Sequence, residues 1–178
     1  MNAFESLVSL LLRRQGYWTT SSFKVEMTKE EKARAGRASS PRWEIDLVAY
    51  QGSTNQVLAV ECKSYFDSAG VQFRNGNFEP PKLYKLFTDG VLREIVLRRL
   101  ATQLVASGAC GAAPRVTLCL AAGKIHRNTD ESGMKQHFES NGWKLFKVDW
   151  LQEQLQLASQ SGYENDIAFI VSKILLRK

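Results

Sequence analysis

Apolar residues near the start of the chain recur every three to four positions. These residues are Phe4, Leu7, Val8 and Leu11. Asn2 can cap the start of a helix here and Gly16 can end it, which predicts a helix over residues 3–15. Glu5 shares a helical face with Val8, so we expect its carboxylate to point inward at the edge of the core.

The pattern then changes to β-branched and aromatic residues. Residues 17–27, YWTTSSFKVEM, predict a strand. Two apolar runs follow at residues 43–50, WEIDLVAY, and 57–64, VLAVECKS, and a polar turn separates them. We expect these runs to be two further strands, paired as a hairpin. Residues 28–42 are polar and mostly basic with a glycine and a proline, and they predict a long loop.

Helices and strands alternate in the second half of the chain. The strongest helical pattern covers residues 91–106, and residues 115–122 are typical of a buried strand. The other expected elements are an irregular stretch over 65–81, a short helix over 82–89, a helix over 134–142, a strand over 143–150, and helices over 151–160 and 166–178. This order predicts a single α/β domain over residues 1–178, with a mixed sheet of about five strands flanked by helices.

Composition and charge narrow the class of protein. A hydrophobic content of 44% and a charged content of 24% are ordinary for a globular domain. The net charge of +6 favours an anionic partner such as nucleic acid, and a solvated basic surface is the equal alternative.

The cysteines are odd in number and form no C-x-x-C pair, which suits a reducing compartment. No apolar run reaches transmembrane length, and basic residues follow the N-terminal apolar run where a signal peptide would have them precede it. We therefore expect a cytoplasmic protein with no membrane partner.

Charged residues interrupt the two apolar strands of the predicted hairpin. Glu61 and Lys63 are two residues apart and share a face, whereas Cys62 points the other way. If the strands pair, Asp46 lies across from Glu61 and Lys63. Burying these charges costs several kcal/mol each unless they are paired or bind an ion. A divalent cation such as Mg²⁺ would relieve the repulsion between the carboxylates. A plain salt bridge on an exposed strand is the alternative.

The spacing of these charges matches a known pattern. Asp46, fourteen intervening residues and Glu61-Cys62-Lys63, on two consecutive apolar strands, resemble the PD-(D/E)XK nuclease superfamily with its restriction-endonuclease-like fold. EIDLVAY stands where that family places its Asp strand, and VLAVECKS where it places its ExK strand. Ile45 replaces the proline of the family's name, a departure found in the Mrr-like branch. The order of the expected elements also matches, so the resemblance covers nearly the whole chain.

The resemblance implies a nuclease that hydrolyses phosphodiester bonds with Mg²⁺ or Mn²⁺, and DNA endonuclease activity is the favoured form. It implies that Asp46 and Glu61 are metal ligands and that the backbone carbonyl of Cys62 is within reach of the metal. Lys63 would be the catalytic lysine that assists attack of water on phosphorus.

Three further residues have weaker counterparts in the superfamily. Many relatives place an acid of the first helix near the metal, and Glu5 fits that position, although a helical acid is often only solvated. Gln103 resembles a glutamine that some relatives place beside the active site. Glu44 shares a strand face with Asp46 and is either a spare ligand or a surface residue.

Basic residues that could contact a phosphate backbone precede and follow the hairpin. They are Lys24, Lys29, Lys32, Arg34, Arg37, Arg42 and Arg74. The segment over 24–42 also contains three glutamates, so a solvated loop is an equal alternative. Other functional interpretations are a nucleic-acid-binding module that does not cut, and a subunit that acts as a homodimer or with a partner.

Overall fold

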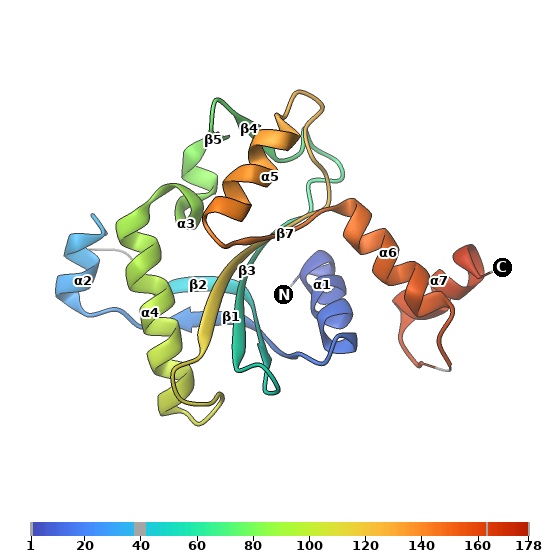
Figure 1. Cartoon of the computed structure of the whole chain (residues 1–178), viewed down its shortest axis with the longest axis horizontal. Helices are drawn as coiled ribbons and strands as arrows, with labels where there is room; N and C mark the ends of the chain where they lie inside the picture. The colour runs from blue at the N-terminus through green and yellow to red at the C-terminus, as the bar shows by residue number, and fades with distance from the viewer. Residues whose placement is uncertain (1, 38–41, 163, 178) are drawn as a thin grey trace.

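The computed structural model describes residues 2–37, 42–162 and 164–177 (Figure 1). The helices are α1 (Ala3–Arg14), α2 (Lys29–Arg34), α3 (Lys85–Thr88), α4 (Gly90–Ala106), α5 (Glu131–Ser140), α6 (Val148–Ser159) and α7 (Ile167–Leu176), with a 3₁₀ turn η1 (Pro81–Leu83). The strands are β1 (Trp18–Val25), β2 (Trp43–Gln51), β3 (Gln56–Lys63), β4 (Gln72–Arg74), β5 (Asn77–Glu79), β6 (Arg115–Ala122) and β7 (Lys144–Phe146). None of the helices described combines the length and apolar character needed to cross a bilayer.

Five of these strands form one mixed sheet in the order β1-β2-β3-β6-β7. β1, β2 and β3 make an antiparallel meander, and β6 and β7 continue it in parallel with β3. β4 and β5 form a separate two-stranded hairpin. The predicted α/β fold, a five-stranded mixed sheet flanked by helices, is confirmed.

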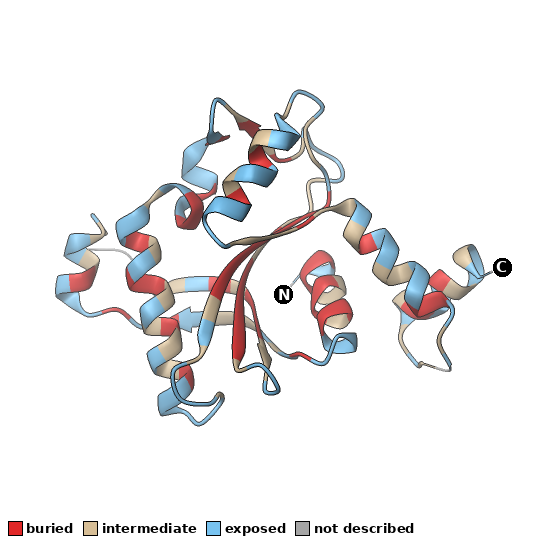
Figure 2. Ribbon diagram, viewed as in Figure 1, coloured by how far each residue is buried: buried red, intermediate tan, exposed pale blue. Residues whose placement is uncertain are grey.

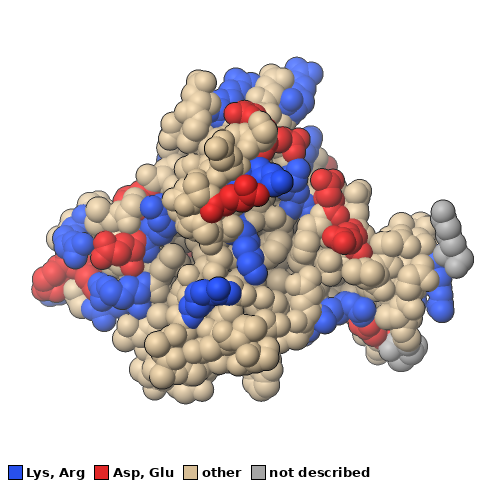
Figure 3. Space-filling view, in the orientation of Figure 1, with Lys and Arg blue, Asp and Glu red and all other residues tan. Residues whose placement is uncertain are grey.

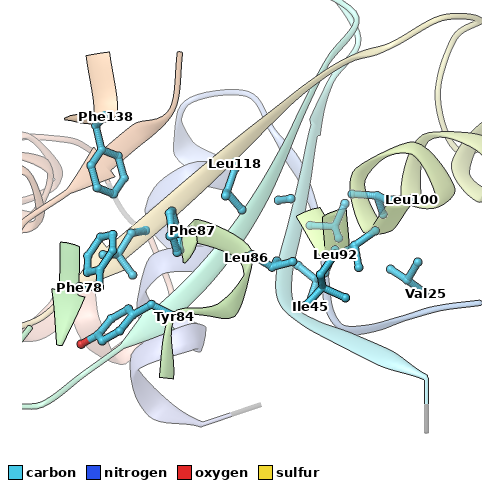
Figure 4. Packing of buried hydrophobic residues seen from close by; sticks show 14 of the residues in the cluster. Val25, Ile45, Phe78, Tyr84, Leu86, Phe87, Leu92, Leu100, Leu118 and Phe138 are labelled. Carbon is cyan, nitrogen blue, oxygen red and sulfur yellow. The ribbon is translucent and has the colours of Figure 1, made fainter. Parts of the chain in front are cut away.

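Two apolar clusters pack on opposite faces of this sheet, as Figure 2 shows by the buried residues that line its centre. On one face α4 contributes Leu92, Ile95, Val96, Leu100 and Leu104 to a cluster that extends to the aromatic residues of β5, α3 and α5 (Figure 4). On the other face α1 packs with residues of α6 and α7. We refer to these as the α4 face and the α1 face. A strand that alternates between two buried faces reads as a continuous apolar run, as β3 does before Glu61.

The prediction of a loop over residues 28–42 is wrong in part, because α2 lies within it. Thr28 and Glu31 form a reciprocal capping box, in which each side chain accepts a hydrogen bond from the other residue's backbone N–H. Glu31 also binds Arg98 and Arg99 of α4. Packing against α4 therefore stabilises a helix that is too short to persist alone. Residues 38–41 of the predicted loop lie outside the described residues.

The prediction of an irregular stretch over residues 65–81 is also wrong in part. Asn75 and Gly76 have φ of 50° and 77°, and they connect β4 to β5. Positive φ at both central residues matches the right-handed twist of a tight hairpin. Phe73 and Phe78 face each other across this hairpin, both fully buried.

The strand predicted over residues 143–150 is much shorter than expected. β7 spans Lys144–Phe146, and α6 already begins at Val148. The aromatic residue Trp150 belongs to the helix, where its ring packs on Phe146 at a centroid distance of 4.4 Å. α5 likewise begins earlier than predicted, because Asp130 caps its first turn by accepting a hydrogen bond from Gly133 N.

Candidate active site

β2 and β3 separate where their charged residues begin. Their antiparallel pairing runs from Gln51↔Gln56 to Leu47↔Val60, and β3 then continues beside β6 as far as Lys63↔Ala122. The carboxylate of Asp46 lies in the gap, where its Oδ2 accepts a hydrogen bond of 2.7 Å from the backbone N–H of Cys62. The side chain of Asp46 therefore takes over the position of a strand-to-strand hydrogen bond.

The backbone of β2 changes face at Asp46. Leu47 packs on the α1 face, whereas Ile45, two residues earlier, packs on the α4 face. The neighbouring strand β1 is irregular at the same place. The β1–β2 pairing passes from Ser21↔Leu47 to Phe23↔Ile45, and Ser22 between them has a φ of 52°. This shared irregularity interrupts the alternation of side chains at Asp46 and leaves its carboxylate free to turn toward β3.

Glu61 and Lys63 are close together on the α4 face of β3. Lys63 Nζ lies 3.7 Å from Glu61 Oε2, and the two side chains are 20% and 13% exposed. Cys62 is buried among the residues of the α1 face. The expectation from strand alternation, that Cys62 points away from the other two, is confirmed.

The site holds more negative charge than its single ammonium compensates. Burial, and after it the charge of Asp46, raise the pKa of Glu61 to about 7 against the opposing effect of Lys63. Burial also raises the pKa of Asp46, with smaller contributions from Glu5 and Glu44, and the Cys62 N–H and Lys63 oppose it. Carboxylates whose pKa values are shifted by burial and by a neighbouring charge are typical of functional sites.

Glu5 is near this group, and Gln103 is engaged elsewhere. Glu5 is buried at the third position of α1, where its carboxylate accepts hydrogen bonds from Asn2, and its charge acts on Asp46. The amide of Gln103 accepts a hydrogen bond from Glu26 N and donates one to Lys24 O. Gln103 therefore joins α4 to the end of β1. Glu44 is exposed and lies opposite Lys24 in the sheet.

Sequence reasoning did not identify Tyr84 as a neighbour of the site. Its ring is buried, stacks on Phe78 at a centroid distance of 4.6 Å, and lies 6.0 Å from Lys63 Nζ. A cation held over an aromatic face is attracted by the ring's quadrupole. The contact joins residues far apart in the chain, and KLYKLF carries no local signal of it.

The carboxylates of Asp46 and Glu61 are the candidate ligands of a divalent metal ion at this site. Across residues 2–37, 42–162 and 164–177, no group of three or more His, Cys, Asp or Glu side chains is placed to hold a metal ion. Asp46 and Glu61 supply two carboxylates whose pKa values are raised by their burial. Mg²⁺ is typically bound by one or two carboxylates, with water and substrate phosphate completing its coordination. The donor set therefore fits a hard divalent cation that keeps several waters.

The basic residues expected to contact nucleic acid are spread over several environments. Lys24, Lys29 and Arg34 are exposed, and Lys32 is partly buried. Arg42 pairs with Glu26, the guanidinium of Arg37 lies over the ring of Trp43, and Arg74 donates to Asn128 O. Figure 3 shows acidic and basic atoms intermixed over α2. On this face α2 is therefore not a uniformly basic surface.

Comparison with known proteins found no matching family, no matching curated protein and no matching solved structure. A fold class by itself does not determine function, because one architecture supports many activities. The function of this chain therefore has to follow from the geometry and chemistry of its site.

Proposed function

We propose that the chain is a divalent-metal-dependent nuclease of the PD-(D/E)XK type, with DNA as the favoured substrate and endonucleolytic cleavage as the favoured reaction. The observation that carries the proposal is the clustering of Asp46, Glu61 and Lys63 where β2 and β3 separate. Two shielded carboxylates beside one ammonium are costly for stability, which suits a site that binds a cation and an anionic substrate.

Each residue of the site has a chemical role in this proposal. Asp46 and Glu61 would hold Mg²⁺ or Mn²⁺, and the Cys62 carbonyl is a further candidate ligand. The bound ion would supply Lewis acidity, which activates water and stabilises charge on the phosphate. Lys63 places a positive charge beside Glu61, where it can stabilise the charge that develops on the phosphate in the transition state. The ring of Tyr84 lies 6.0 Å from Lys63 Nζ, where its negative face attracts the ammonium group.

A second candidate is a nucleic-acid-binding module on the same fold that does not cut or that needs a partner subunit. The positive net charge favours it as much as it favours the nuclease. The crowded carboxylates favour the nuclease, because a module that only binds nucleic acid has no use for them. We also propose a cytoplasmic location, which the free thiols of Cys62, Cys110 and Cys119 support because a reducing compartment favours them.

Cleavage of a panel of labelled substrates tests the proposal. The panel contains plasmid, linear duplex DNA, single-stranded DNA and RNA, each incubated with Mg²⁺, Mn²⁺ or EDTA. We expect metal-dependent cleavage by the wild type, and a loss of about 10²-fold or more in Asp46→Ala and in Lys63→Ala. Lys135→Ala is the control, since Lys135 is an exposed lysine of α5.

Full activity in both site variants would refute the assignment of the site. Salt-dependent DNA binding by the wild type without cleavage or metal binding would favour the second candidate.

A further inference from the structure

A small cavity lies beside the η1–α3 segment and is separate from the carboxylate site. Its volume is about 260 Å³, and its walls come from the residues that follow α2, from η1 and α3, and from the start of α4. The charged and hydroxyl-bearing residues that line it are Arg37, Lys82, Lys85, Thr88 and Asp89. Three cations thus converge on a space that is large enough for a phosphate group.

The three cations of this cavity, Arg37, Lys82 and Lys85, form no ion pair with the residues that the structure describes. Both lysines are exposed. The one acid, Asp89, caps α4, and its Oδ1 accepts a hydrogen bond of 2.9 Å from Leu92 N. Its charge is therefore directed toward the positive end of that helix.

Arg37 is held in place at the wall of the cavity. Its guanidinium lies 4.8 Å from the ring centroid of Trp43, and its Nε is buried without a hydrogen-bond partner among the described residues. Trp43 Nε1 is buried and unpartnered as well. Buried donors without acceptors are rare in native proteins. Among the described residues, this corner of the molecule therefore has an excess of positive charge and two buried donors without an acceptor.

The segment that carries the two lysines of the cavity also contacts the carboxylate site. Tyr84 lies between Lys82 and Lys85 in the chain, and its ring faces Lys63 Nζ at 6.0 Å. The two lysines therefore flank the segment that supports the catalytic lysine of the proposed nuclease. An anion bound by them would lie on the same side of the sheet as that lysine, since Tyr84 packs in the cluster of the α4 face.

We infer that this cavity binds a phosphodiester group of the nucleic-acid substrate at a distance from the bond that is cut, with Lys82, Lys85 and Arg37 as its ligands. The inference rests on the proposed function, because it assigns the substrate's anchoring point on the same chain. Arg37 supplies a planar fork of donors and the two lysines supply mobile point charges, a combination suited to phosphate oxygens. Contacts of this kind fix position on the backbone and carry no base specificity.

Binding measured without cleavage tests the anchor. The anisotropy of a short fluorescein-labelled DNA duplex, and of its single strand, is followed in EDTA across a range of KCl concentrations. We expect Lys82→Ala/Lys85→Ala to weaken binding by about tenfold at low salt and to reduce the slope of log affinity against log salt by about 1. Lys135→Ala/Arg177→Ala removes the same charge from exposed positions and serves as the matched control.

The charge-retaining variant Lys82→Arg/Lys85→Arg should bind as the wild type does. Equal affinities and salt slopes for the wild type and Lys82→Ala/Lys85→Ala would overturn the inference that this cavity binds a phosphodiester group. A wild type that binds neither the duplex nor the single strand would overturn it as well. Cleavage assays on the same variants test the proposed nuclease activity separately from the binding at this cavity. Selective loss of binding in a chain that never cuts would refute the nuclease and retain the anchor.

Discussion

Glu31 and Glu61 are both shielded from solvent, yet their surroundings act on them in opposite directions. Their side chains are 11% and 13% exposed. Burial raises the pKa of Glu31, but hydrogen bonds from Thr28 N, Arg99 and Arg98 outweigh it and lower the pKa to about 2. Burial and the charge of Asp46 raise the pKa of Glu61 to about 7, and Lys63 offsets only part of this.

The difference lies in how many cations each carboxylate has and how close they are. Glu31 is bound by Arg98 at 2.6 Å and Arg99 at 2.7 Å, whereas Glu61 has one ammonium at 3.7 Å and a second acid beside it. The first arrangement joins α2 to α4 and is complete within the protein. The second leaves negative charge that a proton or a further cation would neutralise. A buried acid is thus a functional candidate when its own protein fails to compensate it.

The largest stability effect is expected at Glu31. Glu31→Gln should lower the free energy of unfolding by about 2–3 kcal/mol, because two arginines lose their ionic partner and the capping box loses its carboxylate. Urea denaturation at neutral pH measures this change. Glu94→Gln, an exposed acid on α4, is the control and should leave the unfolding midpoint unchanged. An unchanged midpoint in Glu31→Gln would show that the arginines do not stabilise the fold.

Glu61→Gln should act in the opposite direction. Without metal at pH 8, we expect it to raise the free energy of unfolding by about 1–2 kcal/mol, because it removes the repulsion with Asp46 and the cost of burying the charge. The same urea titration in EDTA provides the measurement. A destabilisation as large as that of Glu31→Gln would mean that Lys63 already compensates Glu61, and the contrast between the two acids would fail.

Divalent cations should stabilise the protein against unfolding through Glu61 and not through Glu31, by less than the effect of Glu31→Gln. Mn²⁺ or Mg²⁺ at tenfold its dissociation constant stabilises a protein by about 1.4 kcal/mol, which raises the melting temperature by a few degrees. We expect this shift in the wild type and in Glu31→Gln, measured by differential scanning fluorimetry against EDTA. Its persistence in Glu61→Gln would place the metal elsewhere.

The pH dependence of stability has opposite signs for the two acids. Glu31 titrates near 2 when folded against 4.5 when unfolded, so its stabilisation is complete above pH 4.5 and is lost as the pH falls toward 2. Glu61 titrates near 7 when folded, so its ionisation lowers stability as the pH rises from 4.5 to 7. Each slope is at most about 1.4 kcal/mol per pH unit.

Unfolding of both glutamine variants in EDTA at several pH values checks these slopes. The difference between Glu61→Gln and the wild type should grow from pH 4.5 to 7. The difference for Glu31→Gln should shrink below pH 4.5. A constant difference for either variant would contradict the corresponding pKa shift.

The parts of the site that follow from local periodicity were predictable from the sequence. Alternation along β3 places Glu61 and Lys63 on one face and Cys62 on the other, and the structure has this arrangement. The meander of β1, β2 and β3 brings Asp46 next to this part of β3. The hydrogen bond from Cys62 N to Asp46 was not predictable, because it depends on where the two strands separate.

Other features had a sequence signal that the predictions did not use. Thr28 and Glu31 have the spacing of a capping box, and Asn75-Gly76 is a typical hairpin turn, yet both lay in segments predicted to lack regular structure. Tyr84 is different, because only tertiary packing against Phe78 and Lys63 identifies it. Local signals thus predict elements, and the environment of a charged group needs the whole fold.

Cleavage by the two matched variants tests the central claim, that the uncompensated carboxylate pair is a metal-dependent hydrolytic centre. Wild type, Glu31→Gln and Glu61→Gln are compared on one DNA substrate with Mg²⁺ or Mn²⁺, at a temperature where all three are folded. We expect Glu31→Gln to cut at nearly the wild-type rate and Glu61→Gln to lose at least about 10²-fold in rate. Equal cleavage by Glu61→Gln and the wild type would contradict it.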